Sequence, residues 1–253
     1  MTFWRDWGKA QGWEEPPSVG EDLRVYAIGD IHGRADLLDE LLIRIGEDDE
    51  SRGSGRVRLI FLGDLVDRGP ASRNVVDRVI SLRHLPNVTC LKGNHEEVFV
   101  MVARGDADAL PFFLRMGGDA TLASYGLPLE AQGELDDDAI LEWIDRTVPD
   151  AHIDFLDDLP GTEQVGDYLF VHAGVRPRVS PEDQSMKDLL WIRQDFLKHR
   201  HRFSHMIVHG HSISEEVDIQ PNRIGIDTGA FQTGRLTAIG LQGTDRWFLQ
   251  TGE

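Results

Sequence analysis

The chain has 253 residues, of which 40% are hydrophobic and 28% are charged, and its formal net charge is −18. These values describe a folded globular protein with a large core, and the excess negative charge disfavours a general grip on nucleic acid. Because no apolar run approaches the roughly 20 residues that span a bilayer, and the N-terminal stretch lacks the apolar centre of a secretory signal, we expect neither a membrane span nor export.

Residues 1–22 contain Trp4, Trp7 and Trp13, and we interpret them as an N-terminal arm preceding one domain over residues 23–253. In the first part of that domain, three apolar runs of strand type alternate with two stretches of helical period. The strands are expected over 25–28, 57–62 and 88–91, and the helices over 35–45 and 72–85. This alternation is typical of βαβ units in a mostly parallel sheet.

The third of these strands contains Cys90, the one cysteine of the chain. A single cysteine excludes an internal disulfide and fits a reducing compartment, so we expect a cytoplasmic protein. Because Cys90 lies within an apolar run, we interpret it as a buried thiol without a catalytic role.

Residues 97–161 have a different character, with several helical stretches interrupted by glycines at 117–118 and by a Gly-Leu-Pro break at 126–128. We interpret this segment as a helical insertion beside the site, within the same domain. Strand patterns then return, with one helix among them. The strands are expected over 168–171, 206–208, 223–226, 236–241 and 246–249, and the helix over 188–197. Their close spacing indicates antiparallel pairing and therefore a partly mixed sheet.

Polar side chains of metal-ligating type follow five of the expected strands. They are Asp30, His32, Asp64, Asn94, His172 and His211. Such oxygen and nitrogen donors, without cysteine, suit manganese, iron or zinc better than magnesium or calcium. Six ligands exceed what one catalytic metal with an open position requires. We therefore expect two divalent metal ions, manganese first with iron or zinc as alternatives, and phosphoester hydrolysis as the chemistry.

Five motifs occur in order along the chain: GDIHG (29–33), GDLVDRG (63–69), GNHE (93–96), HAG (172–174) and GHS (210–212). Together they closely resemble the phosphoprotein phosphatases, the metal-dependent serine/threonine phosphatases within the calcineurin-like metallophosphoesterases. The compact bacterial and phage-type members are most similar, and the resemblance runs from about residue 25 to 240. It implies an α/β fold in which mixed β-sheets form a sandwich flanked by helices.

The resemblance also implies a role for each ligand. Asp30, His32 and Asp64 would hold the first metal. Asp64 would bridge to a second metal, which Asn94, His172 and His211 would complete.

Four further residues match catalytic positions of the resembling family. His95 would be the general acid that protonates the leaving oxygen, and Asp67 would orient it. Arg68 would bind phosphate oxygens, where a planar guanidinium can donate two parallel hydrogen bonds. Arg193, in the sequence Trp-Ile-Arg, is the expected second phosphate-binding arginine.

Three neighbouring features leave alternatives open. His209 shares a strand face with His211 and could be a ligand or support one, although the resemblance favours His211. We interpret Asp227 as a structural turn residue. Gly117 and Gly118 resemble a family glycine pair, but Met116 stands where bacterial members often have asparagine.

The resemblance favours a protein serine/threonine phosphatase, in which a hydroxide bridging two metals attacks phosphorus directly. Phosphorylated proteins, phosphotyrosine and small phosphoesters are the expected substrates, with neither nucleic acid nor a membrane as partner. One alternative is a symmetrical dinucleoside tetraphosphate hydrolase, which commonly lacks the aspartate corresponding to Asp67. Another is a metal-binding scaffold without turnover, against which the complete ligand set argues.

Overall fold

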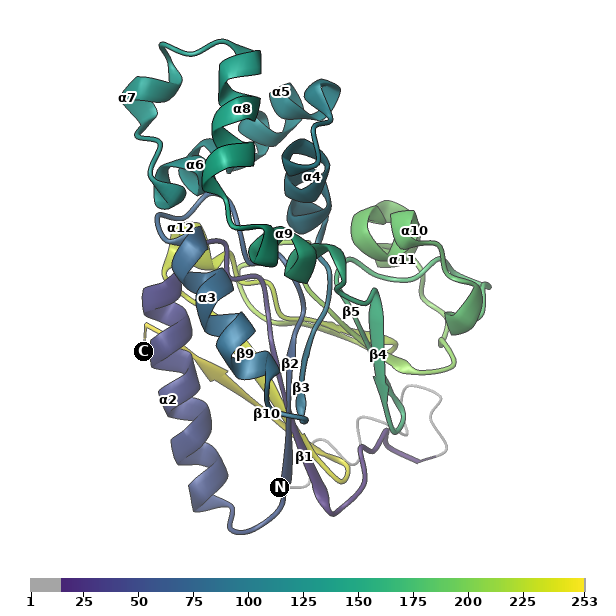
Figure 1. Cartoon of the computed structure of the whole chain (residues 1–253). Coiled ribbons are helices and arrows are strands. Elements are labelled where there is room, and N and C mark those ends of the chain that lie inside the picture. The colour runs from purple at the N-terminus through teal and green to yellow at the C-terminus, as the bar shows by residue number, and fades with distance from the viewer. Residues whose placement is uncertain (1–14, 253) are drawn as a thin grey trace.

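A computed structural model of the chain describes residues 15–252, which form two five-stranded sheets with helices outside them (Figure 1). The strands of the first sheet are β1 (Leu23–Ile28), β2 (Arg56–Phe61), β3 (Val88–Cys90), β9 (Thr237–Gln242) and β10 (Asp245–Gln250). Those of the second sheet are β4 (Thr162–Val165), β5 (Tyr168–Val171), β6 (Met206–His209), β7 (Asp218–Gln220) and β8 (Arg223–Gly225). The strand orders are β10-β9-β1-β2-β3 and β4-β5-β6-β8-β7.

Both sheets are mixed. β1, β2 and β3 are parallel, while β9 and β10 add antiparallel strands beside β1. In the second sheet, β5, β6 and β8 are parallel, and β4 and β7 pair antiparallel at the two edges. The predicted sandwich of mixed sheets flanked by helices is therefore confirmed. The edge strands β4 and β7 were not predicted, because they are short and carry mostly polar residues.

Side chains alternate along the central strands and so build two cores. In β1, Val25 and Ala27 point into the layer between the sheets, whereas Tyr26 and Ile28 point toward the helices. Helices α2 (Ala35–Ser51) and α3 (Ser72–Arg83) cross from strand to strand over that outer face. Because these crossovers keep the strands parallel, the loops at their carboxyl ends meet at one edge of the sheet.

The helical insertion rises above this edge (Figure 1). Its helices are α4 (Asn94–Ala103), α5 (Leu110–Phe113), α6 (Asp119–Tyr125), α7 (Leu129–Gln132), α8 (Asp137–Thr147) and α9 (Asp150–Asp157), with a 3₁₀ turn η1 (Ala107–Ala109) and a π turn η2 (Leu114–Gly118). Phe99 and Phe113 of the insertion belong to the same apolar cluster as the α2 and α3 residues. The insertion is therefore packed into the main core.

The predicted helix over 188–197 is interrupted. The structure has two short helices, α10 (Met186–Trp191) and α11 (Gln194–Leu197), separated by extended backbone at Ile192 and an irregular conformation at Arg193. Two further short helices are η3 (Pro181–Asp183) and α12 (Ala230–Thr233). The break between α10 and α11 turns the chain at Arg193, which matters for the site below.

The last residues before β1 are attached to the sandwich. Val19 is buried between the sheets, and the Ser18 amide donates to Asp167 Oδ2 at 2.9 Å. The tryptophans at 4, 7 and 13 in the expected arm lie outside the described residues. Cys90 is buried, as predicted. No helix among residues 15–252 has both the length and the apolar character to cross a membrane.

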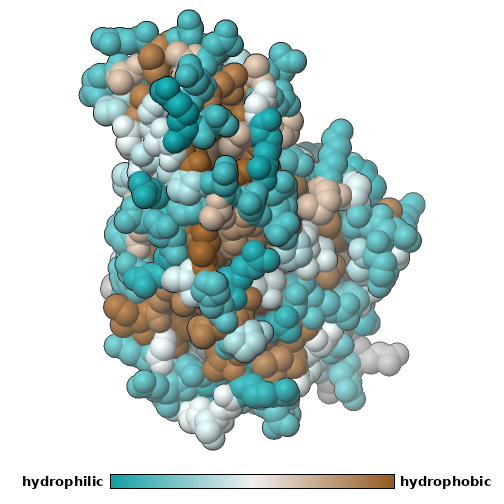
Figure 2. Space-filling view, in the orientation of Figure 1, coloured by the Kyte–Doolittle hydropathy of each residue, from teal (hydrophilic) through white to brown (hydrophobic). Residues whose placement is uncertain are grey.

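The surface in Figure 2 is mostly hydrophilic, as the charge of the chain requires, and hydrophobic side chains gather in its lower half, over α2 and the end of α3. Ile43 and Leu85 are two exposed apolar residues of these segments. Some exposed apolar surface is ordinary for a globular protein.

One polar cluster ties the insertion to α3, and in it His152 and Tyr125 are buried whereas Asp77 is exposed. His152 of α9 lies between the Tyr125 hydroxyl, at 2.9 Å from Nδ1, and the Asp77 carboxylate, at 3.1 Å from Nε2. Burial lowers the pKa of His152, although Asp77 opposes the shift. The folded chain therefore holds this imidazole neutral more readily than the unfolded chain does.

We expect this histidine to make folding stability sensitive to acid. Between about pH 7 and about pH 5 the unfolded chain takes up the proton first, so stability falls as the pH is lowered. The variant H152Q should lose less stability over this interval than the wild type, as measured by urea unfolding at each pH. H84Q, at an exposed histidine, is the matched control, and equal pH dependence of H152Q and wild type would contradict the expectation.

Candidate metal centre and active site

The loops that follow β1, β2, β3, β5 and β6 converge at one edge of the sandwich, and several of their residues have unusual backbone conformations. Positive φ angles occur at His32 (46°), Asp64 (50°), Asp67 (71°), Arg68 (69°) and His211 (60°). In the described part of the chain, the one other non-glycine residue with positive φ is Arg178. Such conformations cost on the order of 1–3 kcal/mol each and are typical of binding and catalytic sites.

Hydrogen-bond acceptors face one another around His172 without hydrogens between them. His172 Nδ1 lies 2.9 Å from the Leu62 carbonyl, so it carries the proton and leaves Nε2 as an acceptor. That Nε2 lies 2.9 Å from Asn94 Oδ1, 3.3 Å from Asp64 Oδ1 and 3.2 Å from His211 Nδ1. Of these groups, His172 Nε2, Asn94 Oδ1 and Asp64 Oδ1 are all acceptors, and three acceptors at these distances repel unless a cation sits among them. This donor set therefore fits a divalent metal ion.

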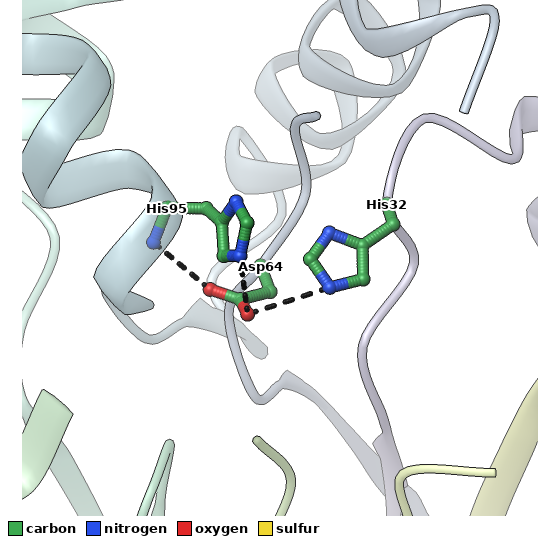
Figure 3. Close-up of side chains that lie close together, drawn as sticks. All are labelled: His32, Asp64 and His95. Carbon is green, nitrogen blue, oxygen red and sulfur yellow. Dashed lines mark hydrogen bonds and ion pairs between the residues drawn. The ribbon is translucent and has the colours of Figure 1, made fainter. Parts of the chain in front are cut away.

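A second cluster shares Asp64 and contains His32 and His95 (Figure 3). The His32 Nδ1–H donates to the Val66 carbonyl at 2.8 Å, which directs the unprotonated Nε2 toward Asp64 Oδ2 at 3.5 Å. Within each group, the three ligand atoms lie within 4.8 Å of one another. One group is His32, Asp64 and His95, and the other is Asp64, His172 and His211. Asp64 belongs to both groups.

The histidines have the protonation state that metal binding requires. Burial lowers the pKa of His32 to about 3 and that of His211 to about 2, and it lowers the pKa of His172 as well. Neutral imidazoles can donate a lone pair to a metal at neutral pH, whereas protonated ones cannot.

Asp30 lies at the edge of these clusters. Its Oδ2 accepts a hydrogen bond from the His211 amide at 2.9 Å, while no donor within residues 15–252 meets Oδ1. Burial first, then the charges of Asp227 and Asp64, raises the pKa of Asp30 well above its usual range. Gly210 makes room for it, since a Cβ there would lie 1.9 Å from Asp30 Oδ1. A nearby cation would stabilise this crowded carboxylate.

His95 and Asp67 form the predicted pair. His95 Nδ1 donates to Asp67 Oδ2 at 2.6 Å, and both side chains are buried. Burial lowers the pKa of His95, but Asp64 and the hydrogen bond to Asp67 outweigh it, so the pKa lies above its usual value. This arrangement favours the protonated imidazole and directs Nε2 toward the centre, as a general acid requires.

The insertion supports this pair directly, which sequence reasoning missed. The Thr121 hydroxyl of α6 donates to Asp67 Oδ1 at 2.7 Å and accepts from the Asp67 amide at 2.8 Å. The Gly117 carbonyl accepts from the Arg68 amide at 3.0 Å. Gly117 itself has φ of 100°, and a Cβ there would lie 2.9 Å from Arg68 Cγ. The glycine is therefore needed for a close approach between the insertion and the GDLVDRG loop.

Arg68 spans the two imidazoles of its cluster. Its Nη1 lies 2.9 Å from His32 Nε2, and its Nη2 lies 2.9 Å from His95 Nε2. The guanidinium carbon lies 4.8 Å from the centre of the Phe231 ring of α12, a cation–π contact that holds it in place. Arg193 is exposed at the break between α10 and α11, and its charge contributes to lowering the pKa of His172 and His211.

His209 and Asp227 do not lie as ligands in either cluster. His209 Nδ1 is 3.0 Å from the Gly210 carbonyl, and its ring meets Phe196 edge to face. Asp227 forms the expected turn, in which Oδ1 accepts from the Gly229 amide at 2.9 Å. It also faces Asp30, and burial raises its pKa to about 6.

Glu96 is a further site residue to which sequence reasoning gave no role. Its buried carboxylate accepts from the amides of Asp64 and Gly93 at 2.8 Å, from Leu65 at 2.7 Å and from Val66 at 3.3 Å. It thereby joins the GDLVDRG loop to the start of α4, and its position three residues after Gly93 is the signal of a capping box.

We expect the variant E96Q to destabilise the fold and to weaken metal binding. The side-chain NH2 of a glutamine cannot accept a hydrogen bond from the backbone N–H groups that the carboxylate now satisfies. Losing a hydrogen bond to a charged group costs about 1.5–3 kcal/mol. Urea unfolding and a manganese titration measure the two effects. E97Q is the matched control, because Glu97 accepts only from the Trp191 indole in the described residues and a glutamine can still do so. Wild-type stability in E96Q would refute this role.

Comparisons with known proteins agree with this geometry. Residues 23–232 match the sequence profile of the calcineurin-like phosphoesterases. The chain is 26% identical over 235 residues to the asymmetrical bis(5'-nucleosyl)-tetraphosphatase PrpE of Oceanobacillus iheyensis, over 85% of this chain and 88% of that protein. It is also 26% identical over 262 residues to a symmetrical bis(5'-nucleosyl)-tetraphosphatase of Neisseria gonorrhoeae, over 86% and 92% of the two chains.

A solved structure shows the same fold. It is a crystal structure provisionally described as that of a diadenosine tetraphosphatase, and it superposes with a TM-score of 0.63 at 20% sequence identity. The superposition covers 93% of this chain and 98% of the other. The profile match over most of the chain, on the residues that form the converging loops, means that the chain belongs to the calcineurin-like phosphoesterase family.

Proposed function

We propose that the chain is a metal-dependent hydrolase of dinucleoside tetraphosphates. The observation that carries the proposal is its similarity, along nearly its whole length, to proteins named as bis(5'-nucleosyl)-tetraphosphatases. The motifs alone favoured a protein phosphatase and placed this activity second. The relatives support the second reading better, and the shared phosphoesterase chemistry is the same in both.

In this proposal, Asp30, His32 and Asp64 hold one divalent ion, and Asp64 with three further residues holds another. The further residues are Asn94, His172 and His211. Bound there, the two ions would polarise the phosphoryl oxygens and lower the pKa of a water molecule shared between them. Manganese is the ion that we expect, with iron or zinc as alternatives.

The remaining side chains bind and orient the phosphate. Arg68 has its two Nη groups directed into the centre, and Phe231 restricts how far its guanidinium can move. Arg193 lies at the break between α10 and α11, and its charge acts on His172 and His211. Together the two arginines would neutralise the equatorial oxygens of the phosphoryl group under attack and keep it in line with the leaving group.

One feature favours a second candidate, the hydrolysis of phosphomonoesters such as phosphoserine in proteins. A nucleotide leaves a phosphoanhydride as a weakly basic phosphate, which needs little protonation. An alkoxide is strongly basic and needs a proton donor. The buried pair of His95 and Asp67, held further by Thr121, is suited to that donation.

A substrate comparison tests the proposed function. With manganese-loaded protein, kcat/KM for diadenosine tetraphosphate should exceed that for a phosphoserine peptide, and chelation should abolish turnover of both. Product analysis decides the position of cleavage: ATP with AMP indicates asymmetrical hydrolysis, and two ADP molecules indicate symmetrical hydrolysis. A higher kcat/KM for the peptide would reject the proposal in favour of the protein phosphatase, and no turnover of any phosphoester would favour the scaffold.

We expect the variant H95N to separate leaving groups by their basicity. Loss of the proton donor should lower kcat by ~10²–10⁴ for a phosphoserine-type substrate. The loss should be much smaller for p-nitrophenyl phosphate, whose phenolate leaves without a proton, and for diadenosine tetraphosphate. Steady-state kinetics on the three substrates measures the difference, and equal losses on all of them would mean that His95 is not the acid.

A further inference from the structure

Beside the metal-ligand clusters lies a cavity that the chemistry described above does not use. It has a volume of about 370 Å³ and lies between the start of the insertion and α10. Its apolar surface comes mainly from Val98, Met101, Phe112 and Trp191. This volume falls within the range of about 300–1,000 Å³ that small-molecule sites occupy.

Two aromatic side chains form one wall of the cavity. The rings of Phe112 and Trp191 lie 5.9 Å apart with an angle of 36° between their planes. Phe112 is 40% exposed, although its neighbour Phe113 is fully buried in the core. An exposed phenylalanine packed on a tryptophan presents a flat apolar surface to solvent, which is the kind of surface on which nucleobases stack.

Trp191 is also held next to the catalytic centre. Its ring meets the His211 ring edge to face at 6.5 Å, and its indole Nε1 donates to Glu97 Oε2 at 2.6 Å. Glu97 follows the GNHE motif in α4, so this hydrogen bond joins the insertion to α10. These two contacts hold the Trp191 side of the aromatic wall in place, directly beside His211, a proposed metal ligand.

The charges around the cavity indicate which end of a bound molecule would lie in it. Its lining includes the carboxylates of Glu97, Asp106 and Asp108 and contains neither arginine nor lysine. Phosphate groups are repelled from such a surface. They would bind instead at Arg68 and Arg193, near the proposed metal centre. Carboxylates instead accept hydrogen bonds from amino groups, and the amino groups of a nucleotide are on its base.

We propose that this cavity binds the purine base of a nucleotide whose phosphates lie at the metal centre. The base stacks on the Phe112 and Trp191 wall, and its amino group faces the Asp106 and Asp108 end. This base site rests on the proposed function. It would be the part of the protein that recognises one half of a dinucleoside tetraphosphate. The aromatic wall comes in part from the helical insertion, which would then select substrates.

Binding measurements with non-hydrolysable ligands test the site directly. The ligands are α,β-methylene ADP, which has a base, and methylenediphosphonate, which has none. Isothermal titration calorimetry of the manganese-loaded protein should show that F112A weakens binding of the first by roughly tenfold or more, since stacking on an aromatic ring contributes about that factor. Binding of methylenediphosphonate should change less than twofold, and F112W should restore affinity for the nucleotide.

The control variant is L129A, which removes an exposed apolar side chain from α7 in the same insertion. It should bind both ligands as the wild type does. Unchanged nucleotide binding in F112A, or an equal loss for both ligands, would overturn the proposal. So would a F112A variant that loses affinity for a phosphoserine peptide alone, because the cavity would then hold a peptide side chain.

Kinetics separates this proposal from the proposed function. F112A should raise KM for diadenosine tetraphosphate and leave kcat/KM for p-nitrophenyl phosphate within about twofold. If the wild type fails to cleave diadenosine tetraphosphate while F112A still weakens the nucleotide analogue, the proposed function fails and the base site stands. If cleavage is efficient and F112A has no effect on it, the proposed function stands and the base site is wrong.

Discussion

The structure depends on a set of hydrogen-bond acceptors that are forced to face one another. His172 Nε2 lies 2.9 Å from Asn94 Oδ1 and 3.3 Å from Asp64 Oδ1, and none of these three atoms supplies a proton to the others. Such an arrangement is unfavourable in a protein interior unless a cation compensates it. The backbone fixes the orientation of the His172 ring, because His172 Nδ1 donates a hydrogen bond to the Leu62 carbonyl.

This constraint explains why the loops are strained and tightly joined. The positive φ angles at His32, Asp64 and His211 aim their side chains inward, and such strain persists only where the surroundings hold it. Glu96 provides part of that support by accepting from four backbone amides. The folded sandwich therefore holds these side chains in positions that the loops would not adopt alone.

The helical insertion has two relations to the centre. Through Thr121 and the Gly117 carbonyl it positions Asp67 and Arg68, which belong to the GDLVDRG loop. Through Phe112 it contributes a wall to the cavity beside Trp191. Because the same segment packs into the main apolar core, its chemistry-bearing residues are placed by the core and not by a flexible lid.

The fold class and the convergence of the loops after the strands were predictable from the sequence, because short apolar runs of strand type were followed repeatedly by Asp, Asn or His. The edge strands β4 and β7 and the break at Arg193 were not, since short polar segments carry no periodic signal. The support from Glu96 and Thr121 to the GDLVDRG loop joins residues 31 and 54 positions apart, which local patterns cannot reveal. The sequence by itself determined which donor atoms the chain possesses and at which strand ends they occur. Only the tertiary structure decided which of them meet and where a neighbouring cavity opens, because both depend on packing between segments that are distant along the chain.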